Sequence, residues 1–123
     1  MGSWGNAGEE ASTRQAQDQA TVGAIRVASI YLPNGNPQPG PKFDYKLGWM
    51  RRLADHASEL LRLEMPIVLA GDYNVCPTAR DVWDEKAMAG DALVQPQSRA
   101  AWRTLVHQGW TDAIRLRHPE ARL

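Results

Sequence analysis

The stretch Pro66-Ile67-Val68-Leu69-Ala70-Gly71-Asp72-Tyr73-Asn74-Val75 joins an apolar run to two polar side chains spaced one residue apart. A short apolar run between a proline and a glycine is typical of a strand covered on both faces. Open α/β sheets place their chemistry just past the carboxyl ends of such strands. The Asp72 carboxylate can take a proton there, and the Asn74 amide can hold an oxyanion. Since Gly, Asp and Asn are also common turn residues, a turn without chemistry is the alternative interpretation.

The residues before this stretch predict a second strand and a long helix. Ile25–Tyr31 is rich in β-branched residues and is followed by a Pro/Gly loop at residues 32–41. In residues 42–63 the apolar side chains recur at intervals of three and four, as in an amphipathic helix. Strand, helix and strand in this order predict two parallel strands. Tyr31 and Asp72 would then lie at one edge of the sheet.

The two ends of the chain carry weaker patterns. Residues 1–23 are polar with little periodicity, so we expect them to be disordered or poorly packed, and we expect residues 24–123 to form one partial α/β domain. Ser98 is expected to cap a short helix after a long irregular stretch, and Asp112 or Thr111 to begin a last one.

Composition excludes several classes of protein. Acidic and basic residues balance at 14 each, so net charge gives no support for nucleic-acid binding. Cys76 is the only cysteine, which rules out an internal disulfide. There is no apolar run of membrane-spanning length and no hydrophobic secretory signal. We therefore expect a cytoplasmic protein with no membrane partner.

Three segments together resemble the exodeoxyribonuclease III family of apurinic/apyrimidinic endonucleases, within the endonuclease/exonuclease/phosphatase superfamily. They are Tyr31-Leu32-Pro33-Asn34-Gly35, Gly71-Asp72-Tyr73-Asn74-Val75-Cys76-Pro77-Thr78 and Gly109-Trp110-Thr111-Asp112. The Gly-Asp-x-Asn motif alone indicates a phosphoester hydrolase. The Tyr-x-Pro ending of the first strand is more selective for this family.

The resemblance implies a four-layer α/β sandwich, of which this chain would be the middle portion with a strand-helix-strand core. It implies Mg²⁺ or Mn²⁺ dependence and hydrolysis of DNA at abasic sites and 3′ ends. Asp72 would orient or deprotonate the attacking water, Asn74 would hold the scissile phosphate, and Tyr31 would hydrogen-bond it. Asp72 and Asn74 are also the candidate metal ligands. Asn34 would add a phosphate contact, and Lys42, near the Tyr31 loop, is expected to line the site.

Two departures from the family's pattern leave other functions open. The metal-binding Glu of the family should lie before Ile25 and its Ser-Asp-His after Leu123, and neither pattern is present in this sequence. The chain alone is therefore expected to be weakly active or inactive. One alternative is a non-catalytic nucleic-acid or protein-binding fragment that self-associates through exposed sheet edges. Another is a small-molecule phosphoesterase, which the Tyr31-Leu32-Pro33 ending disfavours.

Overall fold

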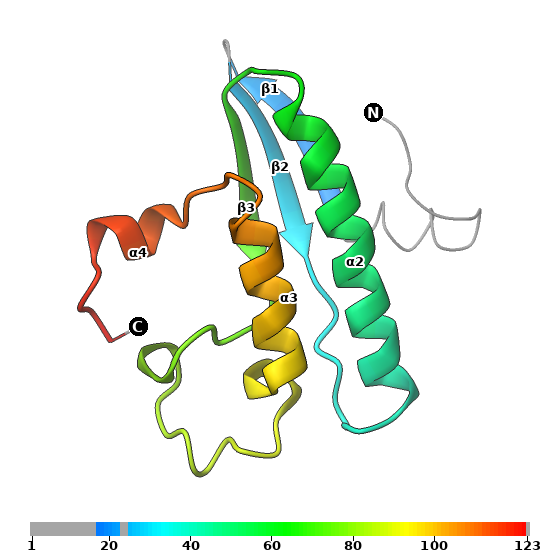
Figure 1. The fold of residues 1–123 in the computed structure, drawn as a ribbon, viewed down its shortest axis with the longest axis vertical. Coiled ribbons are helices and arrows are strands. Elements are labelled where there is room, and N and C mark those ends of the chain that lie inside the picture. Colours follow the sequence, from blue (N-terminus) through cyan, green and yellow to red (C-terminus); the bar gives the residue numbers. More distant parts are fainter. Residues whose placement is uncertain (1–16, 23–24, 123) are drawn as a thin grey trace.

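The computed structural model describes residues 17–22 and 25–122 of the chain. They form a three-stranded sheet in the order β1-β2-β3, with helices against one of its faces (Figure 1). The central strand, β2 (Ile25–Tyr31), runs parallel to β3 (Ile67–Asp72) and antiparallel to β1 (Gln17–Val22). The predicted α/β class and the parallel pair are both confirmed.

The strand β1 corrects the domain boundary expected at residue 24. All six of its residues pair with β2, from Gln17 opposite Ile30 to Val22 opposite Ile25. The sheet therefore begins inside the segment that was expected to be disordered or poorly packed. An edge strand is stabilised by its backbone ladder and by context, so a polar sequence gives little warning of it. Residues 1–16 and 23 of that segment lie outside the described residues.

The long helix connects the two parallel strands. α2 spans Pro41–Leu61, against the predicted 42–63, and has a proline in its first turn, where the missing N–H is tolerated. Its buried side chains recur every three or four residues: Phe43, Lys46, Trp49, Met50, Leu53, Ala57 and Leu60. This stripe contains one lysine among apolar residues.

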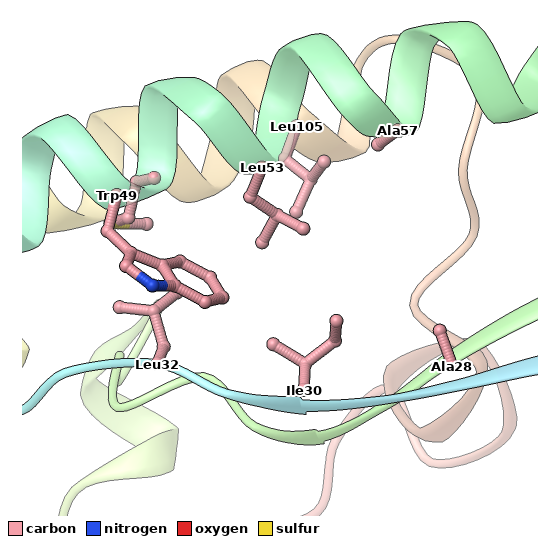
Figure 2. Close-up of a cluster of buried hydrophobic side chains, with 8 residues drawn as sticks. Ala28, Ile30, Leu32, Trp49, Leu53, Ala57 and Leu105 are labelled. Atoms are coloured by element: carbon pink, nitrogen blue, oxygen red, sulfur yellow. The ribbon is translucent and has the colours of Figure 1, made fainter. Parts of the chain in front are cut away.

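The hydrophobic core lies between β2 and the two longer helices. Figure 2 shows Ala28, Ile30 and Leu32 of the central strand and its extension facing Trp49, Leu53 and Ala57 of α2. Met50 of α2 and Leu105 of α3 (Pro96–Val106) complete the cluster. Burial of a large apolar side chain of this kind stabilises the fold by about 1.5–3 kcal/mol.

The opposite face of the sheet is open in the described part of the chain. Ile25 and Val68 are 43% and 46% exposed, and alternate residues of β3 point away from the helices. Within the residues that the structure describes, β3 is therefore covered on one face, not on both as expected. A short apolar run has the same sequence pattern whether one face or both are covered, so the run alone does not distinguish them.

After β3 the chain forms two single turns of 3₁₀ helix, at Ala79–Asp81 and Ala92–Val94, and then α3 and α4 (Ala113–Arg117). Asp112 caps α4 by accepting a hydrogen bond from the Arg115 N–H. Ser98 does not cap α3 as predicted, because it is fully buried and donates to the Ala92 carbonyl at 2.7 Å. Within the described residues no helix is long and apolar enough to cross a membrane.

Candidate active site

Tyr31 and Asp72 lie side by side at the carboxyl ends of the parallel strands. They are partners in the β2–β3 register, and the Leu32 N–H extends the ladder by donating to the Asp72 carbonyl at 2.8 Å. Ala28 and Ile30 face the helices, so Tyr31 points to the open face, and its cross-strand partner Asp72 shares that face. Tyr31 is 63% exposed. The predicted juxtaposition at one edge is confirmed.

Asn74 connects the loops that follow the two strands. Its backbone N–H donates to Asp72 Oδ1 at 2.9 Å, and its side-chain Nδ2 donates to the Leu32 carbonyl at 2.6 Å. A side-chain amide has two N–H donors and an acceptor oxygen, so one donor and the oxygen are left for a ligand. The carboxylate of Asp72 likewise keeps acceptor capacity beyond the Asn74 contact. Both side chains can therefore serve a bound phosphate or cation.

Asn34 organises the loop after β2. Its Oδ1 accepts hydrogen bonds from the backbone N–H and the side-chain amide of Asn36, at 3.1 and 2.6 Å. The Asn36 amide in turn donates to Asp91 at 3.1 Å, which attaches this loop to the second 3₁₀ turn. The oxygen of Asn34 is thus engaged within the loop, and its amide nitrogen is the part available for the expected phosphate contact.

The lysine joined to both loops is Lys46, one helical turn after the expected Lys42. Lys42 is exposed in the first turn of α2, whereas Lys46 has 0% exposure and its Nζ donates to the carbonyls of Asn34 and Asn74, at 3.0 and 2.5 Å. Its place on the apolar stripe of the helix is the sequence signal that could have identified it.

The environment of Lys46 also changes its titration. Burial lowers the pKa of its ammonium group to about 8, and the charges of Asp91, Cys76 and Asp72 only partly oppose the shift. A lysine held in this way is uncommon, because buried ammonium groups usually have a carboxylate partner.

A separate hollow of about 540 Å³ lies along β3, between that strand and the segment from α3 to α4. Tyr73, Trp102, Trp110 and Asp112 are among its lining residues, but Tyr31, Asp72 and Asn74 are not. The three site residues therefore share an edge and a network of loops without opening into this hollow. Tyr73 packs edge-on against Trp102, with ring centroids 5.0 Å apart.

The acidic residue Asp81, in the loop after β3, has a structural role. The Asp81 carboxylate accepts hydrogen bonds from the backbone N–H and the hydroxyl of Thr78, at 3.0 and 2.8 Å. It also pairs with the Arg115 guanidinium at 2.5 Å. Burial opposes ionisation of Asp81, yet these hydrogen bonds outweigh it and lower the pKa of its carboxyl. No group of three or more His, Cys, Asp and Glu side chains suited to a metal ion is present among residues 17–22 and 25–122.

Comparison with known proteins places this arrangement in a family. The sequence pattern of the Endonuclease/Exonuclease/phosphatase family matches residues 7–120. An AP endonuclease from Archaeoglobus fulgidus has a similar structure, with a TM-score of 0.88 and 25% sequence identity. The similarity covers 100% of this chain and 46% of the archaeal one.

Two Neisseria structures are similar as well. A 3′-5′ exonuclease, NExo, from Neisseria meningitidis has a TM-score of 0.81 and 30% identity, covering 86% of this chain and 41% of that one. A 3′ phosphatase NExo from Neisseria, bound to product DNA hairpin, has a TM-score of 0.80, 29% identity and the same coverage. The chain thus spans less than half the length of these structures. The match over nearly the whole sequence shows that the chain belongs to the Endonuclease/Exonuclease/phosphatase family.

Proposed function

We propose that this chain forms the phosphate-holding part of a metal-dependent DNA repair nuclease that acts at abasic sites and 3′ ends. The observation that carries the proposal is the pairing of Tyr31 with Asp72 at the open edge, with Asn74 bonded to both strand ends. The family match and the three DNA-processing neighbours support the same class of substrate. We also propose a cytoplasmic location, on the sequence features given above.

Each side chain has a distinct task in this proposal. A phosphodiester needs an in-line water, a base for its proton, and donors for the charge on its non-bridging oxygens. The Asp72 carboxylate is the base or the group that orients the water, and the Tyr31 hydroxyl and the Asn74 amide are the donors. The Asn34 amide contributes a further donor from the loop.

The residues at this edge fit a divalent cation only in part. Mg²⁺ is commonly bound by one or two carboxylates together with substrate phosphates and water. Asp72 supplies one carboxylate and Asn74 an amide oxygen, while the described residues include no cluster of three ligands. Such an ion, Mg²⁺ or Mn²⁺, would polarise the phosphate and activate water. We therefore propose that the chain alone binds DNA with weak or negligible Mg²⁺-dependent cleavage.

The proposal is tested by measuring the affinity of the purified chain for a DNA duplex with one abasic site. Tyr31→Phe and Asn74→Ala each remove a donor to the phosphate, so each is expected to weaken binding by about 5- to 10-fold, as for loss of a hydrogen bond to a charged group. Tyr45→Phe is the matched control, because Tyr45 lies on α2 and is 40% exposed. It is expected to leave the affinity unchanged. Equal affinities for wild type, Tyr31→Phe and Asn74→Ala would contradict the proposal.

A non-catalytic binding function is the second candidate, and the open apolar face around Val68 favours it. Measurable cleavage would establish nuclease activity for the chain alone, whereas weak or negligible cleavage is the result expected from both candidates. If the wild-type chain cleaves an abasic duplex in Mg²⁺, Asp72→Asn should slow it by about 10²-fold or more, as expected for loss of a general base. A chain that binds the duplex but gives no cleavage, with or without the substitution, has a binding function by itself. Hydrolysis of a small phosphomonoester instead of DNA would favour a phosphoesterase.

A further inference from the structure

Lys46 is a fully buried charged group whose described hydrogen-bond partners are uncharged. Its Nζ donates to the backbone carbonyls of Asn34 and Asn74, at 3.0 and 2.5 Å. Lysine is almost never fully buried unless it is paired, because the ammonium group loses its hydration. The apolar stripe of α2 therefore includes a residue whose burial costs free energy, at a position where the pattern predicts an apolar side chain.

Lys46 lies between the two loops of the candidate site. Its two acceptors belong to different loops, one after β2 and one after β3, and both strands end at the same end of the sheet (Figure 1). Tyr31 ends β2 and Asn34 lies in the first loop, whereas Asp72 ends β3 and Asn74 lies in the second. Lys46 is thus the point at which α2 joins both segments that carry the candidate site.

Two residues next to Lys46, Gly35 and Asn74, have positive φ angles that leave room for its side chain or bring a carbonyl to it. Gly35 has a φ of +90°, and a Cβ built there would lie 2.6 Å from the Cδ of Lys46, so a side chain at position 35 would collide with the lysine stem. Asn74 has a φ of 49°, an uncommon conformation for a residue other than glycine. With this backbone its carbonyl reaches the buried ammonium group, while its side chain reaches the Leu32 carbonyl at 2.6 Å.

We propose that Lys46 is a positioning residue of the phosphate site. It fixes the backbone of the two loops relative to α2, so that the Tyr31 hydroxyl, the Asp72 carboxylate and the Asn74 amide are presented to one phosphate. Lys46 acts through these loops and does not touch the ligand. The proposal rests on the proposed function for the identity of the ligand, a DNA phosphodiester, but its structural part is independent of it.

The wild-type chain allows a direct measurement of the two hydrogen bonds. NMR on ¹⁵N,¹³C-labelled protein, at a concentration where sedimentation shows a single species, is expected to give scalar couplings across the hydrogen bonds from Lys46 Nζ to the carbonyl carbons of Asn34 and Asn74. Coupling to neither carbon, with a rapidly exchanging ammonium group, would overturn the proposal without requiring any variant to fold.

Lys46→Met tests the consequence for the site, because methionine keeps most of the stem and removes the donors. Amide exchange at Asn36 and Asn74 is expected to accelerate about 10-fold or more, as for loss of a hydrogen bond from a charged donor. Exchange in the β2–β3 ladder is expected to stay within about 3-fold of wild type. Equal acceleration in the loops and in the ladder would show a role in overall folding and would overturn the proposal, as would unchanged exchange in the loops.

Lys86→Met is the matched control for charge, since Lys86 is an exposed lysine between the two 3₁₀ turns and has no place in the candidate site. Lys46→Met is expected to weaken binding of an abasic duplex about 10-fold, and Lys86→Met no more than about 3-fold, as for loss of one peripheral charge. Equal losses would show that net charge matters instead of loop placement. If the wild-type chain bound no duplex at all, the proposed function would fail, and the couplings and exchange rates would still decide whether Lys46 holds the loops.

Discussion

At individual positions, the candidate site depends on how closely neighbouring backbones approach. Gly71, in the Gly-Asp-x-Asn motif, has a φ of +140°, and a Cβ there would lie 1.9 Å from the Ile30 carbonyl oxygen of the adjacent strand. Glycine at this position allows β3 to pair with β2 up to Asp72. The motif therefore combines a requirement of the backbone with the chemistry of the following residues.

Gly71→Ala is expected to destabilise the chain by at least about 3 kcal/mol, because the new Cβ collides with backbone and the φ is unfavourable for alanine. Gly90→Ala is the matched control. A Cβ at Gly90 meets nothing within 4 Å, so that substitution is expected to change stability by less than about 1 kcal/mol. Urea unfolding of both variants measures the difference. Similar stabilities for the two would contradict this account of the motif.

Among the elements, those with a clear periodic pattern were predicted best. β2 has the predicted bounds, and α2 lies within two residues of its prediction at each end, because apolar periodicity records contacts with the core directly. β1 was missed, since its stability comes from pairing with β2. The predicted cap at Ser98 was wrong because Pro96 begins α3 and Ser98 is buried against the Ala92 carbonyl.

The candidate site shows the same division between local pattern and tertiary contact. Tyr31 and Asp72 were predicted together from strand order alone, which fixes where parallel strands end. Lys46 was missed because its partners, the carbonyls of Asn34 and Asn74, lie 12 and 28 residues away in the sequence and meet it only in the fold. The roles of Tyr31, Asp72, Asn74, Asn34 and Lys42 in binding stay predictions.

The packing of α2 against β2 gives a prediction for pH dependence. Burial lowers the pKa of His56 below its ordinary value of 6.5, with Arg26 acting in the same direction and Glu59 opposing it. The unfolded chain therefore takes up a proton near pH 6.5, whereas the folded chain does so only at lower pH. The contribution of neutral His56 to stability is accordingly present above pH 6.5 and decreases as the pH falls through that window.

His56→Gln removes this titration, so the stability of wild type relative to His56→Gln is expected to decrease from pH 7.5 to pH 5. Urea unfolding at the two pH values measures the change. His107→Gln, at an exposed position at the end of α3, is the control for the substitution itself. A constant difference between wild type and His56→Gln at both pH values would contradict the assignment of the shifted titration.

In the molecule as a whole, the described residues form an α/β fold in which helices cover one face of the sheet. The other face exposes Ile25, Tyr31 and Val68, and β3 is an edge strand of the described sheet. Exposed apolar patches of more than a few hundred Å² favour association, and open strand edges do the same. We therefore propose that the 123-residue chain self-associates through this face.

Val68→Lys places a charge on the open face, on its edge strand β3, and is expected to reduce this association, seen as a lower weight-average mass in sedimentation at the same protein concentration. Leu116→Lys is the matched control, because Leu116 is 68% exposed and belongs to α4, outside the sheet. Association that is unaffected by Val68→Lys, or equally reduced by Leu116→Lys, would rule out the open face as the contact.

The central claim is that Tyr31, Asp72 and Asn74 form one phosphate site at the carboxyl edge of the sheet. An NMR titration of the ¹⁵N-labelled chain with a short abasic duplex in Mg²⁺ tests it most directly. The account predicts that the largest shifts occur in the Asn74 side-chain amide and in the backbone amides of Leu32 and Asn74. Shifts confined to other surfaces, such as the arginines of α4 or the hollow along β3, with these three signals unmoved, would contradict it.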